Sequence, residues 1–234
     1  MGGSISAGGI LPNDVRRAAV NAALGQTLDG QGDILLYEDF SHGLNAWTLS
    51  PIGIGASVDL TLLQHLSGEF SLRMVSGTGT AIGASAVRPL SFVQLSPIGI
   101  EIAFTLDANS GIVDALISVA NGTTEYDFII RVNAGTGQLQ YQDAGAVFQN
   151  IQALTPSTTS GLFHRLKCVF NPKTGLYDRI IFDTQTITSL AGVPARSFAN
   201  AASFLQAAVR TGPAAAVSTT NYIGRCVVTV NEVL

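Results

Sequence analysis

Short runs of alternating apolar and polar residues, separated by glycine, asparagine and proline, fill this chain of 234 residues from Asp33 onward. Alternation with a period of two is typical of strands that are buried on one face, and no long helical pattern lies between most of the runs. The sequence therefore predicts an all-β domain over residues 34–234, folded as an antiparallel jelly-roll β-sandwich. The runs lie at 34–40, 57–63, 70–76, 98–107, 113–120, 126–133, 138–143, 162–171, 177–183 and 226–234.

Residues 1–33 have a different pattern, and we call them the N-terminal arm. A Gly/Ser stretch is followed by "LPNDVRRAAVNAALGQ", in which Asn13 is a candidate N-cap and Gly25 a candidate stop for one short helix. The apolar face of this helix is mostly alanine, so alone in water it is marginal. We expect it to dock on its own domain or on another subunit. The residues expected to anchor the arm are Val15, Arg16, Arg17, Val20 and Leu24.

A hairpin is predicted over residues 163–183, with "NPKTG" as its turn. Strict alternation divides each of its strands into two faces. The first strand is expected to point Leu166, Cys168 and Phe170 inward and Arg165 and Lys167 outward, and the second to place Tyr177, Arg179 and Ile181 on one face. Elsewhere, residues 155–161 are expected to form a plain loop and residues 197–209 to hold a helical turn or two.

Charge and hydrophobicity limit the partners of the chain. Charged residues make up only 12% of the sequence, the formal net charge is −4, and Lys167 and Lys173 are its only lysines. No basic field exists to attract nucleic acid or anionic lipid, so neither partner is expected. So weakly charged a chain has a surface that is either covered by neighbouring subunits or rich in small polar residues, and both alternatives stay open.

Targeting and cysteine signals add little. The first residues lack both a basic region and a continuous apolar region, so no standard secretory signal is expected, and no apolar run of 18 residues or more is present to span a membrane. Cys168 and Cys226 both lie in expected strands, where they are either two buried thiols or a bridge between adjacent strands.

Four segments resemble the concanavalin A-like, laminin G-like jelly rolls. They are "EDFSHGLNAW" at 38–47, "LSGEFSLRM" at 66–74, the hairpin at 163–183 and "YIGRCVVTVNEVL" at 222–234. The resemblance covers roughly residues 34–234 and implies that fold. Members of the family often hold structural calcium near the first and last strands, which makes Glu38 and Asp39 candidate ligands. Gly224 and Arg225, however, stand where the resemblance implies an acidic pair, so no cofactor is predicted.

Catalytic signatures are sparse. Family members that hydrolyse glycans place acidic residues at alternate positions on one strand, and Glu125 and Asp127 follow that spacing until Ile129 and Arg131 interrupt it. The alternative is an exposed strand face. The three histidines are isolated, and neither a nucleophile elbow nor a C-x-x-C motif occurs. We therefore expect no catalytic site and a protein that is not an enzyme.

Sugar binding by such a fold requires exposed aromatic rings. Trp47, Tyr141 and Tyr177 are the candidates, although each also occupies a position where a core residue is expected.

These observations together favour a structural subunit of an assembly. The first hypothesis is a phage virion component, a capsid decoration or tail accessory protein that assembles in the host cytoplasm. The arm would anchor it to other copies of itself and to neighbouring subunits, in a homo-oligomer. The alternatives are a lectin-like carbohydrate-binding module with a surface glycan as its partner, and a glycoside hydrolase of the same fold.

Overall fold

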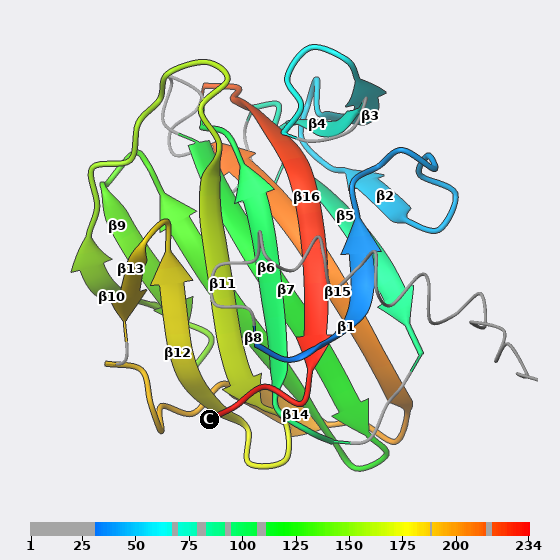
Figure 1. The fold of residues 1–234 in the computed structure, drawn as a ribbon, viewed down its shortest axis with the longest axis vertical. Coiled ribbons are helices and arrows are strands. Elements are labelled where there is room, and N and C mark those ends of the chain that lie inside the picture. Colours follow the sequence, from blue (N-terminus) through cyan, green and yellow to red (C-terminus); the bar gives the residue numbers. More distant parts are fainter. Residues whose placement is uncertain are drawn as a thin grey trace, which may run out of the picture.

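The computed structural model of the chain describes residues 31–66, 70–78, 83–91, 95–106, 111–187, 189–213 and 217–234 (Figure 1). These residues form sixteen strands and no helix. The strands are β1 (Asp33–Glu38), β2 (Thr48–Pro51), β3 (Ser57–Thr61), β4 (Ser71–Val75), β5 (Ala84–Leu90), β6 (Ile98–Phe104), β7 (Gly111–Asn121), β8 (Thr124–Asn133), β9 (Gln138–Gln142), β10 (Phe148–Ala153), β11 (His164–Asn171), β12 (Leu176–Phe182), β13 (Gln185–Ile187), β14 (Arg196–Ala199), β15 (Ser203–Pro213) and β16 (Thr220–Val230).

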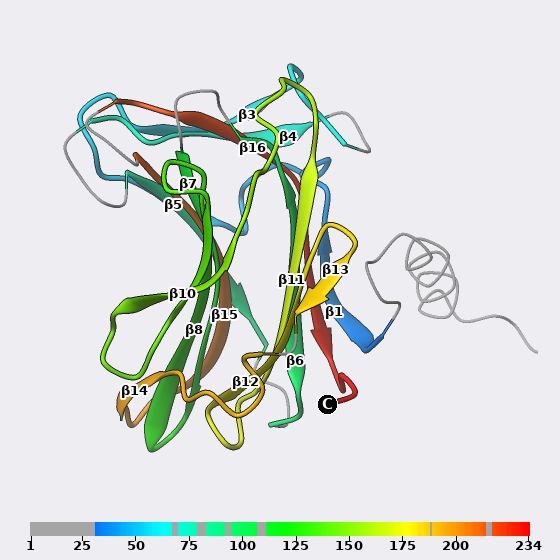
Figure 2. The same cartoon turned by 90° about the vertical axis from the view of Figure 1, so that its left-hand side faces the viewer.

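The strands form two antiparallel sheets of eight strands each. Sheet A has the order β13-β12-β11-β6-β16-β4-β3, with β1 also paired to β16. Sheet B has the order β10-β9-β8-β7-β15-β5-β2, with β14 also paired to β8. The two sheets pack face to face, and sheet B curves so that its outer face is concave (Figure 2). The predicted jelly-roll β-sandwich is confirmed.

The core lies between the sheets and follows the predicted alternation. On β6, the isoleucines at 98, 100 and 102 point inward and are at most 2% exposed. On β8, Phe128, Ile130 and Val132 do the same from the opposite sheet. Cys168 and Cys226 are buried free thiols in this core, on strands that β6 separates. Burial raises the pKa of the Cys226 thiol to about 12, because a thiolate there would lose its hydration.

The β11–β12 hairpin forms as predicted, with one correction. The expected inward residues of β11 lie in the core, but the β12 partner register shifts between Val169 and Phe170. This bulge places Tyr177 opposite Phe170 and Arg179 opposite Val169, so Tyr177 points inward and Arg179 outward. The expectation that Tyr177 and Arg179 share a face is therefore wrong, because strict alternation fails across a bulge.

The helical turn expected within residues 197–209 is also wrong. The segment instead holds β14 and the first part of β15, separated at Asn200, whose side chain accepts a hydrogen bond from the backbone of Ala202. Along β15, Leu205, Ala207 and Val209 point into the core. The residues between them are partly apolar as well, which hides the period of two. Pairing with β7 and β5 on either side decides the conformation.

The helix predicted in the N-terminal arm lies outside the described residues, as do the anchoring residues Val15, Arg16, Arg17, Val20 and Leu24. Of the arm, residues 31–33 are described, and they lead into β1. No helix long and apolar enough to cross a membrane occurs in the described part of the chain.

Candidate functional site

The outer face of sheet B carries an organised set of polar side chains. We call it the concave face (Figure 2). The strand registers arrange its side chains in four rungs that cross the strands. In order along β8, the rungs are Arg131, Asp114, Arg210 and Ser85; then Ile129, Leu116, Ala208 and Val87; then Arg196, Asp127, Ser118 and Gln206; then Phe198, Glu125, Ala120 and Phe204.

The first rung is built around an ion pair. Nε of Arg131 donates to Oδ1 of Asp114 at 2.8 Å, and Nη2 donates to Oδ2 at 3.0 Å, which is a bidentate pair. The Arg131 guanidinium also lies 3.5 Å from the ring centroid of Phe148, which β10 brings in from the sheet edge. The Arg131 guanidinium is therefore held by the Asp114 carboxylate at its edge and by the Phe148 ring at its face.

The second rung is apolar. Leu116, Ile129 and Ala208 form a small buried cluster of their own, separate from the main core, with Val87 and Phe148 packed against it. Such a cluster on the outside of a sandwich is unusual because that side of a sheet normally faces water. It places a hydrophobic strip between two polar rungs.

The third and fourth rungs carry acidic and aromatic groups. Ser118 Oγ donates to Asp127 Oδ1 at 2.5 Å, and Arg196 lies 3.6 Å from the other carboxylate oxygen. In the fourth rung, Glu125 accepts a hydrogen bond from Asn200, which follows β14 in the chain. Phe198 on β14 lies opposite Glu125 and is 39% exposed. The concave face thus combines hydrogen-bonding groups, the exposed Arg196 side chain and an exposed ring.

Glu125 and Asp127 face the same side of β8, in agreement with the alternation in the sequence. Both carboxylates are mostly buried and hydrogen-bonded to neighbours in the sheet. Carboxylates on one face of one strand are an arrangement that glycan cleavage uses. The spacing in the sequence predicted that Glu125 and Asp127 share a face. The same i, i+2 spacing of Asp127, Ile129 and Arg131 places Arg131 on that face. No signal in the sequence showed that Asp114 and Phe148 belong to the same surface.

The three aromatic candidates for sugar binding lie in or against the core. Trp47 is buried, and its indole nitrogen donates to Glu38 Oε2 at 3.1 Å. Tyr177 is 1% exposed, and its hydroxyl accepts from Ile129 N at 2.9 Å and donates to the Gln142 carbonyl at 3.0 Å. Tyr141 packs edge-on against Tyr177, with ring centroids 5.7 Å apart. The structure places none of these three rings on the concave face.

The candidate calcium ligands Glu38 and Asp39 serve their own loop. Glu38 Oε1 accepts from the backbone of Phe40 at 2.8 Å, and Asp39 accepts from the backbone and hydroxyl of Ser41. Among the described residues, no group of three or more histidine, cysteine, aspartate or glutamate side chains is arranged to hold a metal ion. Arg225, near the other end of the expected site, instead pairs with Glu101 at 2.9 Å.

His164 forms an ion pair outside the concave face. Its Nδ1 lies 2.9 Å from Asp183 Oδ2, and its Nε2 lies 2.9 Å from the Ser157 carbonyl. Burial by itself lowers the pKa of His164, but the contacts with Asp183 and Ser157 outweigh it and raise that pKa above its ordinary value. This pair ties the loop at 155–161, which is confirmed as a loop, to the β12–β13 turn.

A hollow of about 260 Å³ opens at one end of the sandwich. Gln64 spans it, donating to Ser160 Oγ at 2.8 Å and accepting from Gly161 N at 3.2 Å. Its lining is neutral and consists of Gln64, Thr105, Leu106, Thr158, Ser160, Thr220 and Tyr222.

Solved structures define the class to which this fold belongs. The cellulose-induced protein Cip1 superposes with a TM-score of 0.57 at 14% identity, covering 83% of this chain and 96% of that one. An endo-β-1,4-glucuronan lyase from the fungus Trichoderma reesei gives 0.56 at 13%, covering 84% and 95%. A carbohydrate esterase from the Shiga toxin-encoding bacteriophage phi24B gives 0.55 at 15%, covering 85% and 99%. The fold is the concanavalin A-like jelly roll that the sequence motifs resembled.

Sequence comparison alone finds no relatives, since no family model and no curated protein match the chain. The expectation that the chain is not an enzyme is contradicted by the structural comparison, because chains with this fold include a lyase and an esterase. That expectation rested on missing signature motifs.

Proposed function

We propose that this chain is a carbohydrate-active jelly-roll protein that binds a glycan across the concave face of sheet B. The observation that carries the proposal is the exposed Phe198 ring beside the Arg196 guanidinium at the edge of that face, next to its hydrogen-bonded polar rungs. A sugar ring has apolar C–H faces and a rim of hydroxyls, so an exposed aromatic ring beside hydrogen-bonding groups matches both. Two proteins that share the fold are named for action on glucuronan and on carbohydrate, which supports this class of ligand.

Of the rung residues, Arg196 and Phe198 on β14 are the exposed ones. Phe198 is 39% exposed, and the Arg196 side chain is 44% exposed, with its guanidinium 5.1 Å from the Phe198 ring centroid. A ring that stacks on a sugar face and a guanidinium that donates to its hydroxyls are common partners in glycan recognition. These two residues are therefore the first contacts we expect a glycan to make.

The test is binding of defined soluble polysaccharides, measured by affinity electrophoresis and titration calorimetry. The panel holds a neutral β-glucan, a xylan and an anionic glucuronan. Phe198→Ala and Arg196→Ala are each expected to weaken binding of the preferred polymer about fivefold or more. Arg73→Ala is the matched control, because Arg73 is a similarly exposed arginine on sheet A. Binding that both variants retain, or no binding to any of the three polymers, would overturn the proposal.

Glycan cleavage is a second candidate function, favoured by Glu125 and Asp127 on one face of β8. Glu125→Gln and Asp127→Asn are expected to abolish release of sugar ends from the bound polymer while leaving binding in place. Asp143→Asn, in the β9–β10 turn, is the control acid. Activity that survives both substitutions would exclude this pair as the catalytic groups.

The virion role predicted from the sequence depends on the N-terminal arm, of which residues 1–30 lie outside the described residues. It stays a prediction, and it is compatible with glycan binding by the concave face.

A further inference from the structure

The outer face of sheet A carries charged side chains that are as buried as the core. Its central rung consists of Lys167 on β11, Glu101 on β6 and Val227 on β16, which are paired in register. Each of them is at most 2% exposed, and so is Arg225 one step along β16. Outer faces of sandwiches normally meet water, so this burial needs a covering layer.

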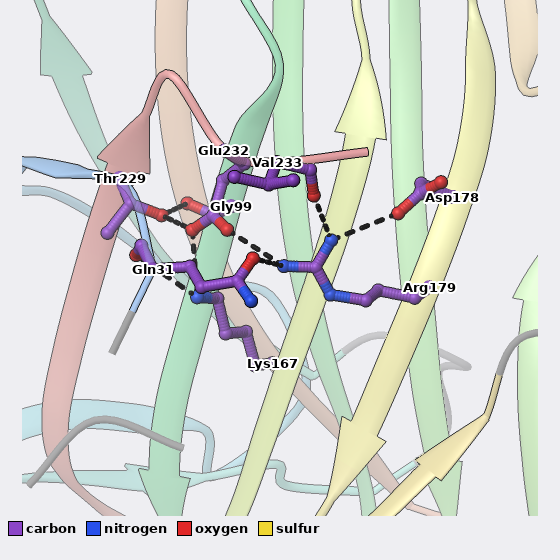
Figure 3. Close-up of polar contacts among 8 residues, drawn as sticks. All are labelled: Gln31, Gly99, Lys167, Asp178, Arg179, Thr229, Glu232 and Val233. Carbon is purple, nitrogen blue, oxygen red and sulfur yellow. Dashed lines mark hydrogen bonds and ion pairs between the residues drawn. The ribbon is translucent and has the colours of Figure 1, made fainter. Parts of the chain in front are cut away.

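One end of this face is closed by an ionic network that Figure 3 shows in detail. Glu232, in the segment after β16, accepts from Lys167 Nζ at 2.8 Å and from Arg179 Nη2 at 3.0 Å, and also from the Thr229 hydroxyl. A Cβ added at Gly99 would lie 2.7 Å from Glu232 Oε1, so that glycine makes room for the carboxylate. The segment 231–234, which supplies Glu232, and Gln31 together cover this network.

The other end is closed by side chains of two loops. A Cβ on Gly224 would lie 2.7 Å from the Phe163 ring and 2.8 Å from Leu66 Cβ, which shows that both side chains pack on this strand.

The middle of the face lies between these two covers. There Arg225 Nη2 donates to Glu101 Oε1 at 2.9 Å, with side-chain exposures of 1% and 3%. In the described part of the chain, no strand lies over this middle region (Figures 1 and 2). A buried ion pair is tolerated only where protein replaces the water around it. Tyr37 on β1 stands opposite Val227 in the register, and strands do not account for the rest of the burial of Glu101 and Arg225.

We propose that residues 1–30 of the same chain cover the middle of this face. The chain enters the described domain on this face, since the Gln31 carbonyl is 3.5 Å from Lys167 Nζ and the Gln31 side chain accepts from Arg179 at 2.9 Å. Gly32 follows with a φ of +80°, which turns the chain into β1. Residues 1–30 therefore end next to the middle of this face.

Length and chemistry fit this occupant. The seven residues of β6 span about 23 Å, and a helix over residues 13–24 would span about 18 Å. The arm carries two apolar residues, Val20 and Leu24, that can pack on Val227. It also carries both signs of charge, as the face does; its charged residues are Asp14, Arg16, Arg17 and Asp29. An alanine-rich helix that is marginal alone would gain stability by packing there.

The test uses the full chain with a site-specific protease sequence placed between Gln26 and Gln31, cut after folding. The cut protein is then passed over a sizing column with light-scattering detection. We expect the arm fragment to stay bound one-to-one in a particle close to the 24.3 kDa of the chain. Release of the fragment from a remainder that stays folded would overturn the proposal. Retention only in dimers or larger particles would overturn the same-chain occupant and assign the face to a second copy.

Arm variants keep the test independent of the stability of the sandwich. Val20→Asp combined with Leu24→Asp is expected to speed release of the cut fragment about tenfold or more, because two buried apolar side chains are lost. Asn21→Asp adds a charge to the same segment and is the matched control, with little change expected. Equal release rates for both variants would contradict docking through the apolar side of the arm.

Discussion

Replacing Glu232 with glutamine measures how strongly the buried network on sheet A holds the fold. The Lys167 and Glu232 side chains are 1% and 0% exposed, and Arg179 is 12% exposed. Glutamine keeps the size of the side chain but removes the charge, which leaves buried cations without their shared partner. Breaking a buried pair in this way costs about 3–5 kcal/mol of unfolding free energy. For a chain of this size that corresponds to a fall in Tm of about 6–20 °C.

Urea unfolding followed by fluorescence is the assay. The chain has a single tryptophan, Trp47, which is buried beside Glu38 and far from the substitution in sequence, so its emission reports global unfolding. The control is Asp59→Asn, which breaks an ion pair to Arg73 with side chains 44% and 37% exposed. We expect a loss of about 0–1 kcal/mol from that exposed pair.

A loss below about 1 kcal/mol for Glu232→Gln would refute the reasoning, because the network would then behave like an exposed pair. The double variant Glu232→Gln, Lys167→Met separates the two contributions. Since methionine removes the buried ammonium, the double variant should be more stable than Glu232→Gln alone.

Three further predictions use other sites. Gly99→Ala would place a Cβ 2.5 Å from Thr229 Oγ1, and we expect it to destabilise the fold by about 1–3 kcal/mol in the same urea assay. Tyr177→Phe removes the acceptor of the Ile129 amide from the core and should cost about 1–3 kcal/mol without changing the m-value. His164→Gln should have a pH-dependent cost. The pKa of His164 is raised from 6.5, so its contribution is complete below that pH and is lost as the pH rises through the raised value. Burial works against ionisation of Asp183, but its contacts with His164 and Arg165 lower its pKa from 3.8, so its contribution is lost only as the pH falls through the lowered value. The stability difference between wild type and His164→Gln should therefore be largest at about pH 4–6 and smaller at about pH 9, and a difference that grows with pH would show that the pair has the opposite sign.

The residues that point inward on β8 and β11 could be predicted from the sequence because alternation is a local property. A strand that is buried on one face repeats its apolar residues every two positions wherever it lies in the fold. The hairpin turn at "NPKTG" could be predicted for the same reason, since its conformation depends on a few adjacent residues.

The candidate site could be predicted only in part. The spacing of Glu125 and Asp127 placed them on one face of a strand, and the structure agrees. Nothing local to Asp114 or Phe148 shows that they meet Arg131, because β7 and β10 come to β8 through pairings that the sequence pattern does not specify. Alternation did place Trp47, Tyr141 and Tyr177 at expected core positions, but the contact of Tyr141 with Tyr177 joins strands of opposite sheets, which no local pattern shows.

The sequence by itself determined that this chain is an all-β protein with its core on alternate residues, since that information lies in each strand separately. The tertiary structure decided three other features: the bulge that turns Tyr177 inward, the strand in place of a helical turn after Asn200, and the faces on which charged side chains are buried. Each depends on which strand pairs with which, and that choice is made by contacts between residues far apart in the chain. Lys167 shows the difference most directly: alternation correctly pointed it away from the core, yet Gln31 and Glu232 bury it.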